Sequence, residues 1–198
     1  MKKIATICFL ILFSVTVTSQ TKTNQFDVQG QRTGLWKKQF ENGNIRYSGQ
    51  FEKGKEIGVF KFYSEENSET PTIIKEYVSH SNIAKVQFFT AAGKLQSTGE
   101  LEGKKRTGKW TFYDANGAVS SEENYIKGQL SGGYKMFYEN GVLAEFTHFT
   151  AGKLDGTAAY YNLKGALLGT GSFSKGEKIG EWEYFEEGDP SRKSLGKY

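Results

Sequence analysis

The chain has 198 residues, enough for one domain or two small ones, and its net charge of +4 is too small to indicate nucleic-acid binding. It contains 24 glycines but only 2 prolines, and it is rich in aromatic residues, with 3 Trp, 11 Tyr and 15 Phe. This composition is typical of short strands joined by tight turns and argues against a helical protein.

Residues 1–19 are predicted to form a secretory signal peptide. Two lysines precede an apolar run from Ile4 to Val17, and small residues suit cleavage between Ser19 and Gln20. An uncleaved membrane anchor is the alternative, but the run is shorter than the ~20 residues that span a bilayer. We therefore expect an exported protein that works in the periplasm, at the outer-membrane surface or outside the cell.

The mature chain begins at Gln20 in this interpretation and lacks cysteine, because Cys8 lies in the signal peptide. It can form neither a disulfide nor a thiolate metal site. Without the first two lysines it keeps 24 basic residues against 22 acidic ones, which gives a net charge of +2. We expect no nucleic-acid partner.

The mature chain repeats a pattern in which two glycines four residues apart are followed by an aromatic residue. Alignment on the position two residues after the second glycine gives seven units, at Trp36, Phe60, Val86, Trp110, Tyr134, Ala158 and Trp182. The spacing is 24 residues except for 26 before Val86, where the polar insert 65–72 absorbs the difference. The third unit has His80 and Ala84 in place of its glycines, yet the register continues through it.

Each unit is predicted to hold two strands and two turns. Asn-Gly pairs at Asn42, Asn116 and Asn140 mark the turn after the first strand, and both positions of such a pair tolerate positive φ. The second strand alternates apolar and polar residues, as in segment 45–51, and a Lys-Gly turn closes the unit. One unit buries too little surface to fold alone, so neighbouring units must cover each other.

The predicted fold is all-β: an elongated meander of about seven stacked 24-residue β-hairpin repeats in a single twisted or coiled antiparallel sheet. Residues 20–29 form a lead-in, residues 30–188 the repeat domain and residues 189–198 a C-terminal tail. The units start near residues 30, 54, 80, 104, 128, 152 and 176.

The segment GKKRTGKW, residues 103–110, is close to the phosphate-binding pattern G-x-x-x-x-G-K-[ST]. That motif needs a Ser or Thr after the lysine and a helix after the turn, whereas Trp110 and a predicted strand follow here. The match is a variant of the repeat turn. We expect neither a nucleotide nor another cofactor.

The segment YSGQFEKGKEIGVF, residues 47–60, resembles a MORN (membrane occupation and recognition nexus) repeat. Tyr47, Gly49, Phe51 and the two glycines of the turn motif fall on its pattern. Phe60 replaces the final glycine and the period is 24, departures similar to those of the bacterial MORN-variant branch, in which some members carry an antitoxin label. The resemblance covers about residues 30–188. It implies stacked β-hairpins and a binding or scaffolding role, and its phospholipid association transfers less well.

One candidate binding surface is a second aromatic stripe with one ring in each of six units. Its members are Tyr63, Phe89, Tyr113, Phe137, Tyr161 and Phe185. The residues before them are expected to share the opposite face with the Trp36 series: Phe62, Phe88, Phe112, Met136, Tyr160 and Tyr184. Twist and coiling could bury both stripes, or the second stripe could be an exposed ladder for a peptide, a polysaccharide or a protein surface.

The other candidate surface is a basic edge, because alternate turns of a meander lie on opposite edges. The Lys-Gly turns carry Lys53, Lys55, Lys104, Lys105, Arg106, Lys127, Lys153, Lys175 and Lys178. Acidic residues dominate the Asn-Gly turns. Solvated turns are often charged in any case, but a basic edge also suits anionic lipid headgroups or acidic glycans.

Residues for catalysis or metal binding are scarce. The two histidines, His80 and His148, have no Ser, Cys or carboxylate partner at a suggestive spacing. We therefore expect a non-enzymatic protein without a metal site. Its predicted function is a protein-protein interaction module or scaffold, with an antitoxin-like role included, and the alternative is a peripheral envelope binder of anionic lipid headgroups or polysaccharide.

Overall fold

The computed structural model describes residues 22–78 and 81–198, which form one antiparallel sheet in which neighbours in sequence are neighbours in space. The predicted signal peptide and His80 lie outside the described residues. The strands are β1 (Gln25–Phe26), β2 (Arg32–Gln39), β3 (Ile45–Glu52), β4 (Lys55–Phe62), β5 (Ile73–Tyr77), β6 (Ile83–Phe89), β7 (Leu95–Glu102), β8 (Lys105–Tyr113), β9 (Val119–Ile126), β10 (Gln129–Leu130), β11 (Gly132–Phe137), β12 (Leu143–Thr150), β13 (Lys153–Tyr161), β14 (Leu167–Ser174), β15 (Glu177–Phe185) and β16 (Lys193–Lys197). A short 3-10 helix, η1 (Glu186–Gly188), joins the last two strands.

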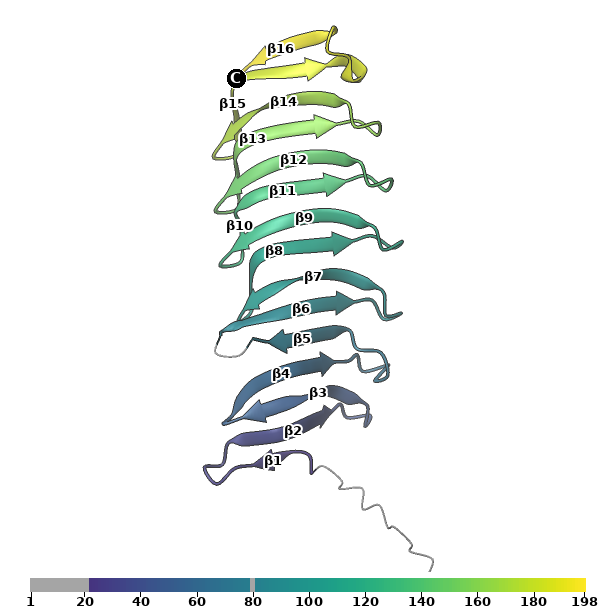
Figure 1. Ribbon diagram of the computed structural model, residues 1–198, viewed down its shortest axis with the longest axis vertical. Coiled ribbons are helices and arrows are strands. Elements are labelled where there is room, and N and C mark those ends of the chain that lie inside the picture. Colours follow the sequence, from purple (N-terminus) through teal and green to yellow (C-terminus); the bar gives the residue numbers. More distant parts are fainter. Residues whose placement is uncertain (1–21, 79–80) are drawn as a thin grey trace, which may run out of the picture.

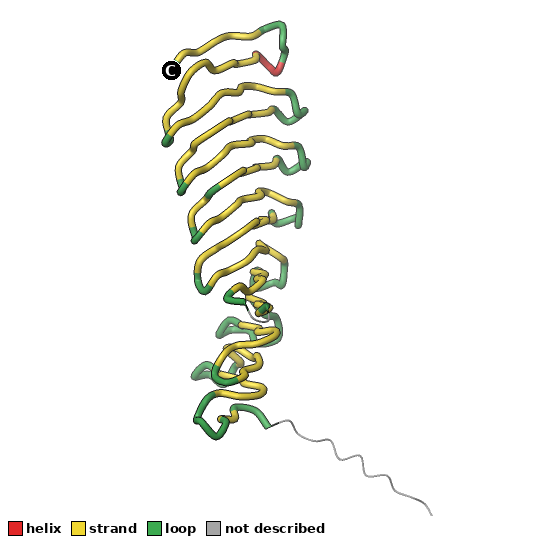
Figure 2. The backbone as a smooth tube through the Cα atoms, turned by 60° about the vertical axis from the view of Figure 1, so that its left-hand side comes forward, coloured by secondary structure: helices red, strands yellow, loops and turns green. Residues whose placement is uncertain are grey.

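The hairpins stack into a column one layer thick (Figure 1). The sheet twists along its length, so the first hairpins are turned relative to the last ones (Figure 2). No helix among the described residues is long and apolar enough to cross a membrane. The all-β meander of stacked hairpins in a single twisted sheet is confirmed. The 65–72 insert lies in the connection between β4 and β5, as the spacing of 26 predicts.

The turns follow a different rule from the one that we expected. Both residues of the two-residue Lys-Gly turns have positive φ, for example Lys53 at 48° and Gly54 at 74°. At the Asn-Gly turns only the glycine does, as Gly43 shows at 86°, and the loop is longer, with the Phe40 amide donating to the Asn44 carbonyl. The Asn-Gly pairs mark turns, as predicted, but the longer loop leaves Asn42 outside the left-handed region that such a pair tolerates.

The second glycine of the turn motif forms a bulge between one unit and the next at Gly58, Gly108, Gly156 and Gly180. Between β7 and β8, Thr98 pairs with Thr111 and Glu100 pairs with Thr107, so Gly99 alone faces residues 108–110. Gly108 has a φ of 62°, which glycine adopts without strain. The same shift recurs around Gly49 and Gly171. The spacing of the two glycines therefore encodes a tight turn followed by a bulge.

In three units the bulge places a large side chain against a glycine of the preceding strand. Phe60, Trp110 and Trp182 are completely buried, and a Cβ atom added to Gly99 would lie 2.4 Å from the Trp110 ring. Gly49 and Gly171 face Phe60 and Trp182 equally closely. A single-layered sheet thus buries its rings against its own backbone. Val86 is also fully buried, which confirms that the register survives through the third unit.

Candidate functional site

The buried rings belong to one face of the sheet, which we call the aromatic face. Its rings include Trp36, Phe51, Phe60, Phe62, Phe88, Trp110, Phe112, Tyr125, Tyr134, Tyr160, Trp182 and Tyr184. Trp110 and Phe112 stack with their centres 6.1 Å apart, and Trp182 and Tyr184 stack at 6.2 Å. These contacts confirm that the residues before the second stripe share a face with the Trp36 series.

A basic side chain covers each tryptophan of this face. The guanidinium carbon of Arg106 lies 4.6 Å from the centre of the Trp110 ring, and the Lys178 ammonium lies 4.3 Å from that of Trp182. Arg32 lies 5.7 Å from the Trp36 ring and 4.1 Å from the Phe51 ring. Each cation stands four residues before its tryptophan, and the bulge brings the two together. Such contacts stabilise the fold through cation-π attraction.

Arg106 also begins a hydrogen-bond chain across the aromatic face. It donates to the Tyr125 hydroxyl at 2.9 Å, and that hydroxyl donates to the Glu123 carboxylate. Burial, followed by the hydrogen bond to Glu123, raises the pKa of Tyr125 above its usual range, although Arg106 opposes this shift. The phenol therefore stays protonated as a donor to the carboxylate.

The second aromatic stripe lies at the Asn-Gly ends of the strands. Each of its rings is half-buried, and four of them pair across a hairpin with an aliphatic residue: Phe89 with Leu95, Tyr113 with Val119, Phe137 with Leu143 and Tyr161 with Leu167. In the part of the chain that the structure describes, no ring of this stripe is in an aromatic pair with another. The stripe is therefore neither fully buried nor fully exposed. Four of its rings pair with aliphatic residues, and all six keep part of their surface accessible to solvent.

The basic edge divides into two groups. The turn residues Lys53, Lys55, Lys104, Lys105, Lys127, Lys153 and Lys175 are all exposed. Arg106 and Lys178 instead fold back over the aromatic face, where they are half-buried. The sequence signal for this difference is the position four residues before a tryptophan, which our edge prediction did not use.

The opposite edge is tied together by asparagine side chains. The Asn140 amide donates to the Leu163 carbonyl of the next unit at 3.1 Å, and Asn162 donates to the Glu187 carbonyl at the same distance. Asn42 and Asn44 both donate to the Glu65 carbonyl. The Asn-Gly turns thus join successive hairpins as well as reversing the chain.

The described histidine lies in ordinary packing. The His148 ring packs edge-on against Phe146 at 4.9 Å, and its Nδ1 lies 3.2 Å from the Thr157 hydroxyl. Among residues 22–78 and 81–198, no group of His, Cys, Asp and Glu side chains is arranged to hold a metal ion.

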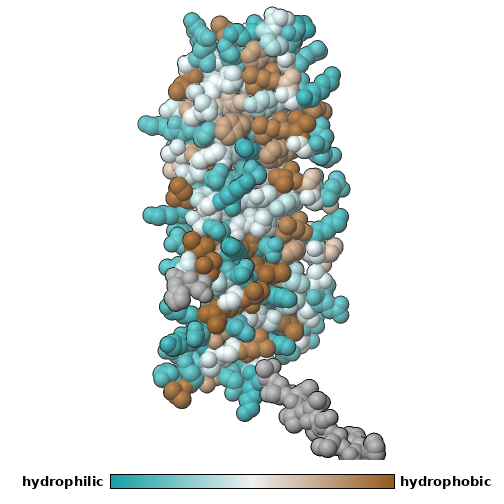
Figure 3. Space-filling view, viewed as in Figure 1, coloured by the Kyte–Doolittle hydropathy of each residue, from teal (hydrophilic) through white to brown (hydrophobic). Residues whose placement is uncertain are grey.

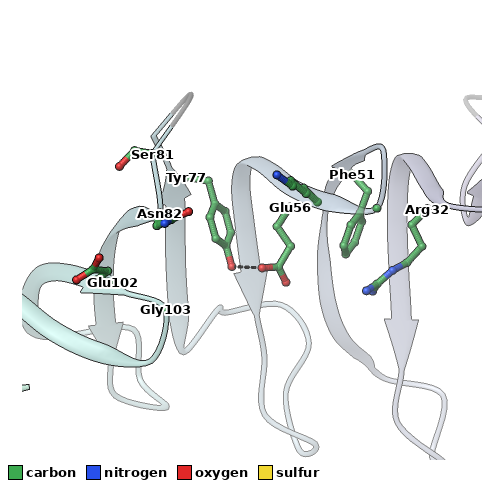
Figure 4. A pocket seen from close by; sticks show the side chains of 10 residues that line it. Arg32, Phe51, Glu56, Tyr77, Ser81, Asn82, Glu102 and Gly103 are labelled. Carbon is green, nitrogen blue, oxygen red and sulfur yellow. Dashed lines mark hydrogen bonds between the residues drawn. The ribbon is translucent and has the colours of Figure 1, made fainter. Parts of the chain in front are cut away.

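A shallow groove of about 660 Å³ opens along the Lys-Gly edge, from β2 to the turn after β7 (Figure 4). Arg32, Phe51 and Tyr77 contribute to its wall, and the Tyr77 hydroxyl donates to Glu56 there. Burial and this hydrogen bond raise the pKa of Tyr77 above its usual range. Figure 3 shows the wider surface, with hydrophobic patches on the face in view and hydrophilic side chains along both turn edges.

The comparison with protein families matches two segments of this sheet. The family described as MORN repeat variant matches residues 32–53 and 106–127. The chain carries MORN-variant repeats. Each matched segment starts at a cation that covers a tryptophan, Arg32 or Arg106, and runs through the following hairpin to a Lys-Gly turn. No curated protein matches the chain.

The match to the MORN-variant family at these two segments indicates a repeat-based binding module. The GKKRTGKW segment forms the β7–β8 turn and the start of β8 of such a repeat. Its lysine-tryptophan end lies in the bulge opposite Gly99, where the Trp110 indole donates to the Glu100 carbonyl at 3.1 Å. Trp110, the residue that departs from the phosphate-binding pattern, therefore belongs to the hydrophobic core.

Proposed function

We propose that this MORN-variant chain is an exported module that binds another protein. The observation that carries the proposal is the second aromatic stripe, which recurs in six units and keeps partly exposed rings, four of them beside aliphatic neighbours. Partly exposed aromatic side chains in a row suit a protein surface, because they bury much area at little cost in side-chain entropy. Export rests on the N-terminal sequence, with its two lysines, apolar run and small residues before Gln20. An antitoxin-like pairing is one form that such binding would take.

A second candidate is a peripheral envelope protein that binds anionic lipid headgroups or polysaccharide. The observation that favours it is the row of exposed lysines on the Lys-Gly edge, where Lys104 and Lys105 lie side by side. Such binding would weaken steeply with salt, since exposed charges are screened within about 10 Å at 0.1 M salt.

The test is capture of a partner from envelope extract by the immobilised chain. Replacing Tyr113, Phe137 and Tyr161 with Ser should abolish capture while circular dichroism keeps its strand signal, and Lys104→Gln with Lys105→Gln should change little. The reverse outcome, a salt-sensitive loss from the lysine variant alone, would support the lipid or glycan candidate. If the triple variant loses its strand signal, Phe137→Lys replaces it, because one changed ring leaves the other repeats intact.

Export has its own measurement. Mass spectrometry of the extracytoplasmic protein should find Gln20 at the amino terminus, with or without cyclisation. Intact Met1 protein confined to the cytosol would contradict export.

A further inference from the structure

Two carboxylates interrupt the aromatic face near its middle. Glu145 on β12 pairs with Met136 on β11 and with Tyr160 on β13. Glu123 on β9 pairs with Trp110, and the pairing of Lys135 with Glu122 brings Tyr134 beside it. The two glutamates thus lie on either side of β11 on the face that carries the tryptophans. Two strand spacings, about 10 Å, separate their strands.

These carboxylates have no ionic partner among the described residues. The three ion pairs of the described chain involve Lys109, Arg192 and Lys193 with other glutamates. Glu123 accepts hydrogen bonds from the Tyr125 hydroxyl and, at 3.4 Å, from Ser121. Both glutamates are half-buried and still open to solvent. A partly buried pair of carboxylates without an ionic partner attracts a cation.

Glu145 lies beside a buried hydroxyl group and an aromatic ring. Burial raises the pKa of Glu145, and the nearby Thr147 hydroxyl partly offsets this rise. Thr147 is completely buried, and its hydroxyl makes no regular hydrogen bond to any group described. The pKa of Tyr134 is also raised, first by burial and then by Glu145 and Glu123 together. The ring of Tyr134 therefore lies in the negative field of both carboxylates.

The three units with a tryptophan show what this unit lacks. Trp36, Trp110 and Trp182 are each covered by a cation that stands four residues earlier in the chain. The residue four before Tyr134 is Leu130, and no cation-π contact reaches Tyr134 within residues 22–78 and 81–198. Tyr134 thus combines an aromatic ring and flanking carboxylates with no cation of its own.

We propose that the ring of Tyr134, between Glu123 and Glu145, binds a lysine or arginine side chain of the protein partner. The inference rests on the proposed protein-binding function and specifies the chemistry that the partner presents at this point. A basic side chain would neutralise the two carboxylates and lie on the ring as Arg106 lies on Trp110. An arginine would fit best, because its planar group both stacks and donates to carboxylates.

Met136 provides a local reporter, because it is 40% exposed, pairs with Glu145, and is one of two methionines in the chain. The full chain labelled with ¹³C at the methionine methyls is titrated with acetyl-Gly-Arg-Gly-amide, and Met136→Leu assigns the signal. The neutral isostere acetyl-Gly-citrulline-Gly-amide is the control ligand. We expect a saturable shift of the Met136 signal with the arginine peptide and none with the citrulline peptide.

Glu145→Gln and Glu123→Gln should each lower the affinity for the arginine peptide about fivefold, which is the upper range for an ion pair that is partly exposed to solvent. Glu76→Gln, which removes an exposed carboxylate beside Val59 and Lys85, should leave the affinity unchanged. Equal shifts with both peptides, or unchanged affinity in both glutamate variants, would overturn the proposal.

Capture from envelope extract then separates this inference from the function on which it rests. One outcome is that the chain captures a partner whose binding requires the rings of the second aromatic stripe, and that Glu145→Gln and Glu123→Gln bind this partner as well as the parent chain does. In that case the proposed cation site is wrong and the proposed protein binding stands. If the peptide binds but no partner is captured, the site stands and the proposed function fails.

Discussion

Gly99 and Trp110 face each other across the bulge between β7 and β8, with the flat side of the indole against the glycine backbone. A Cβ atom on Gly99 would lie 2.4 Å from the ring, closer than atoms in proteins approach. The same relationship holds between Gly49 and Phe60 and between Gly171 and Trp182. The glycine of the preceding strand therefore makes room for the large side chain that forms the core.

Gly99→Ala should lower the free energy of unfolding by about 2 kcal/mol, because the added methyl forces the Trp110 ring out of its buried position. Chemical denaturation followed by tryptophan fluorescence measures the change. Gly133→Ala is the matched control, since its Cβ would meet nothing closer than 3.4 Å and its φ is not in the left-handed region. Equal losses in the two variants would show that the ring has no part in the effect.

The chain itself contains the compensated version of this pair. Between the fifth and sixth units, Thr147 stands at the glycine position and pairs with Ala158, and both residues are buried. Gly99→Thr should therefore cost less in a Trp110→Ala background than in the parent chain. A double-mutant cycle with additive costs would contradict this volume exchange.

Much of this core could be predicted from the sequence. The 24-residue period and the residue two after the second glycine identify Phe60, Val86, Trp110 and Trp182, because a repeated turn and bulge place the same position in the core each time. The third unit lacks both glycines of the motif, but the period still predicts the core position of Val86. The hairpin meander followed from short alternating strands and glycine turns.

Contacts that depend on the bulge could not be predicted in the same way. Arg106 was assigned to the basic edge on its turn position, yet the register shift at Gly108 brings it over Trp110. Glu123 and Glu145 were not predicted as site residues, because in the sequence each looks like a charge on a strand with no partner at a suggestive spacing. Only the pairing of β9, β11 and β12 shows that both lie on the aromatic face.

Arg106→Gln should lower the free energy of unfolding by about 1–2 kcal/mol, because it removes the cation over Trp110 and the hydrogen bond to Tyr125. Lys104→Gln and Lys105→Gln, both in exposed turn positions, should each change it by less than about 0.5 kcal/mol. Chemical denaturation of the three variants provides the comparison. Three equal effects would place Arg106 among the solvated turn residues after all.

Asn140→Asp should separate the two roles of this turn asparagine. Its side-chain oxygen accepts from the Val142 amide within the turn, and its nitrogen donates to the Leu163 carbonyl of the next unit. Aspartate keeps the first contact and loses the second, so we expect a loss of about 1 kcal/mol, and Asn140→Ala should cost more because it loses both. Thermal unfolding measures both variants, and an Asp variant as stable as the parent would mean that the contact between units contributes nothing.

Glu145→Gln should stabilise the chain at neutral pH while it weakens binding of the basic peptide. Burial raises the pKa of Glu145 above its usual value near 4.5, so the folded state favours the protonated form and ionisation at neutral pH is unfavourable. As the pH falls through the raised pKa towards 4.5, Glu145 becomes protonated and the parent chain regains the stability that ionisation cost. The glutamine variant does not titrate here, so its stability does not change through this residue. The advantage of Glu145→Gln should therefore be largest near pH 7, at less than about 1 kcal/mol for a half-exposed group, and should shrink towards pH 4.5.

Denaturation midpoints of the parent, Glu145→Gln and Glu76→Gln across pH 4.5–7.5 test this expectation, since the titration of all other groups cancels in the difference from the parent. If Glu145→Gln is more stable than the parent chain and binds the basic peptide more weakly, Glu145 contributes to binding at a cost in stability. If Glu145→Gln destabilises the chain at pH 7 and the difference does not change with pH, Glu145 instead supports the fold through contacts of its own, and the vacant cation position at Tyr134 loses its electrostatic basis.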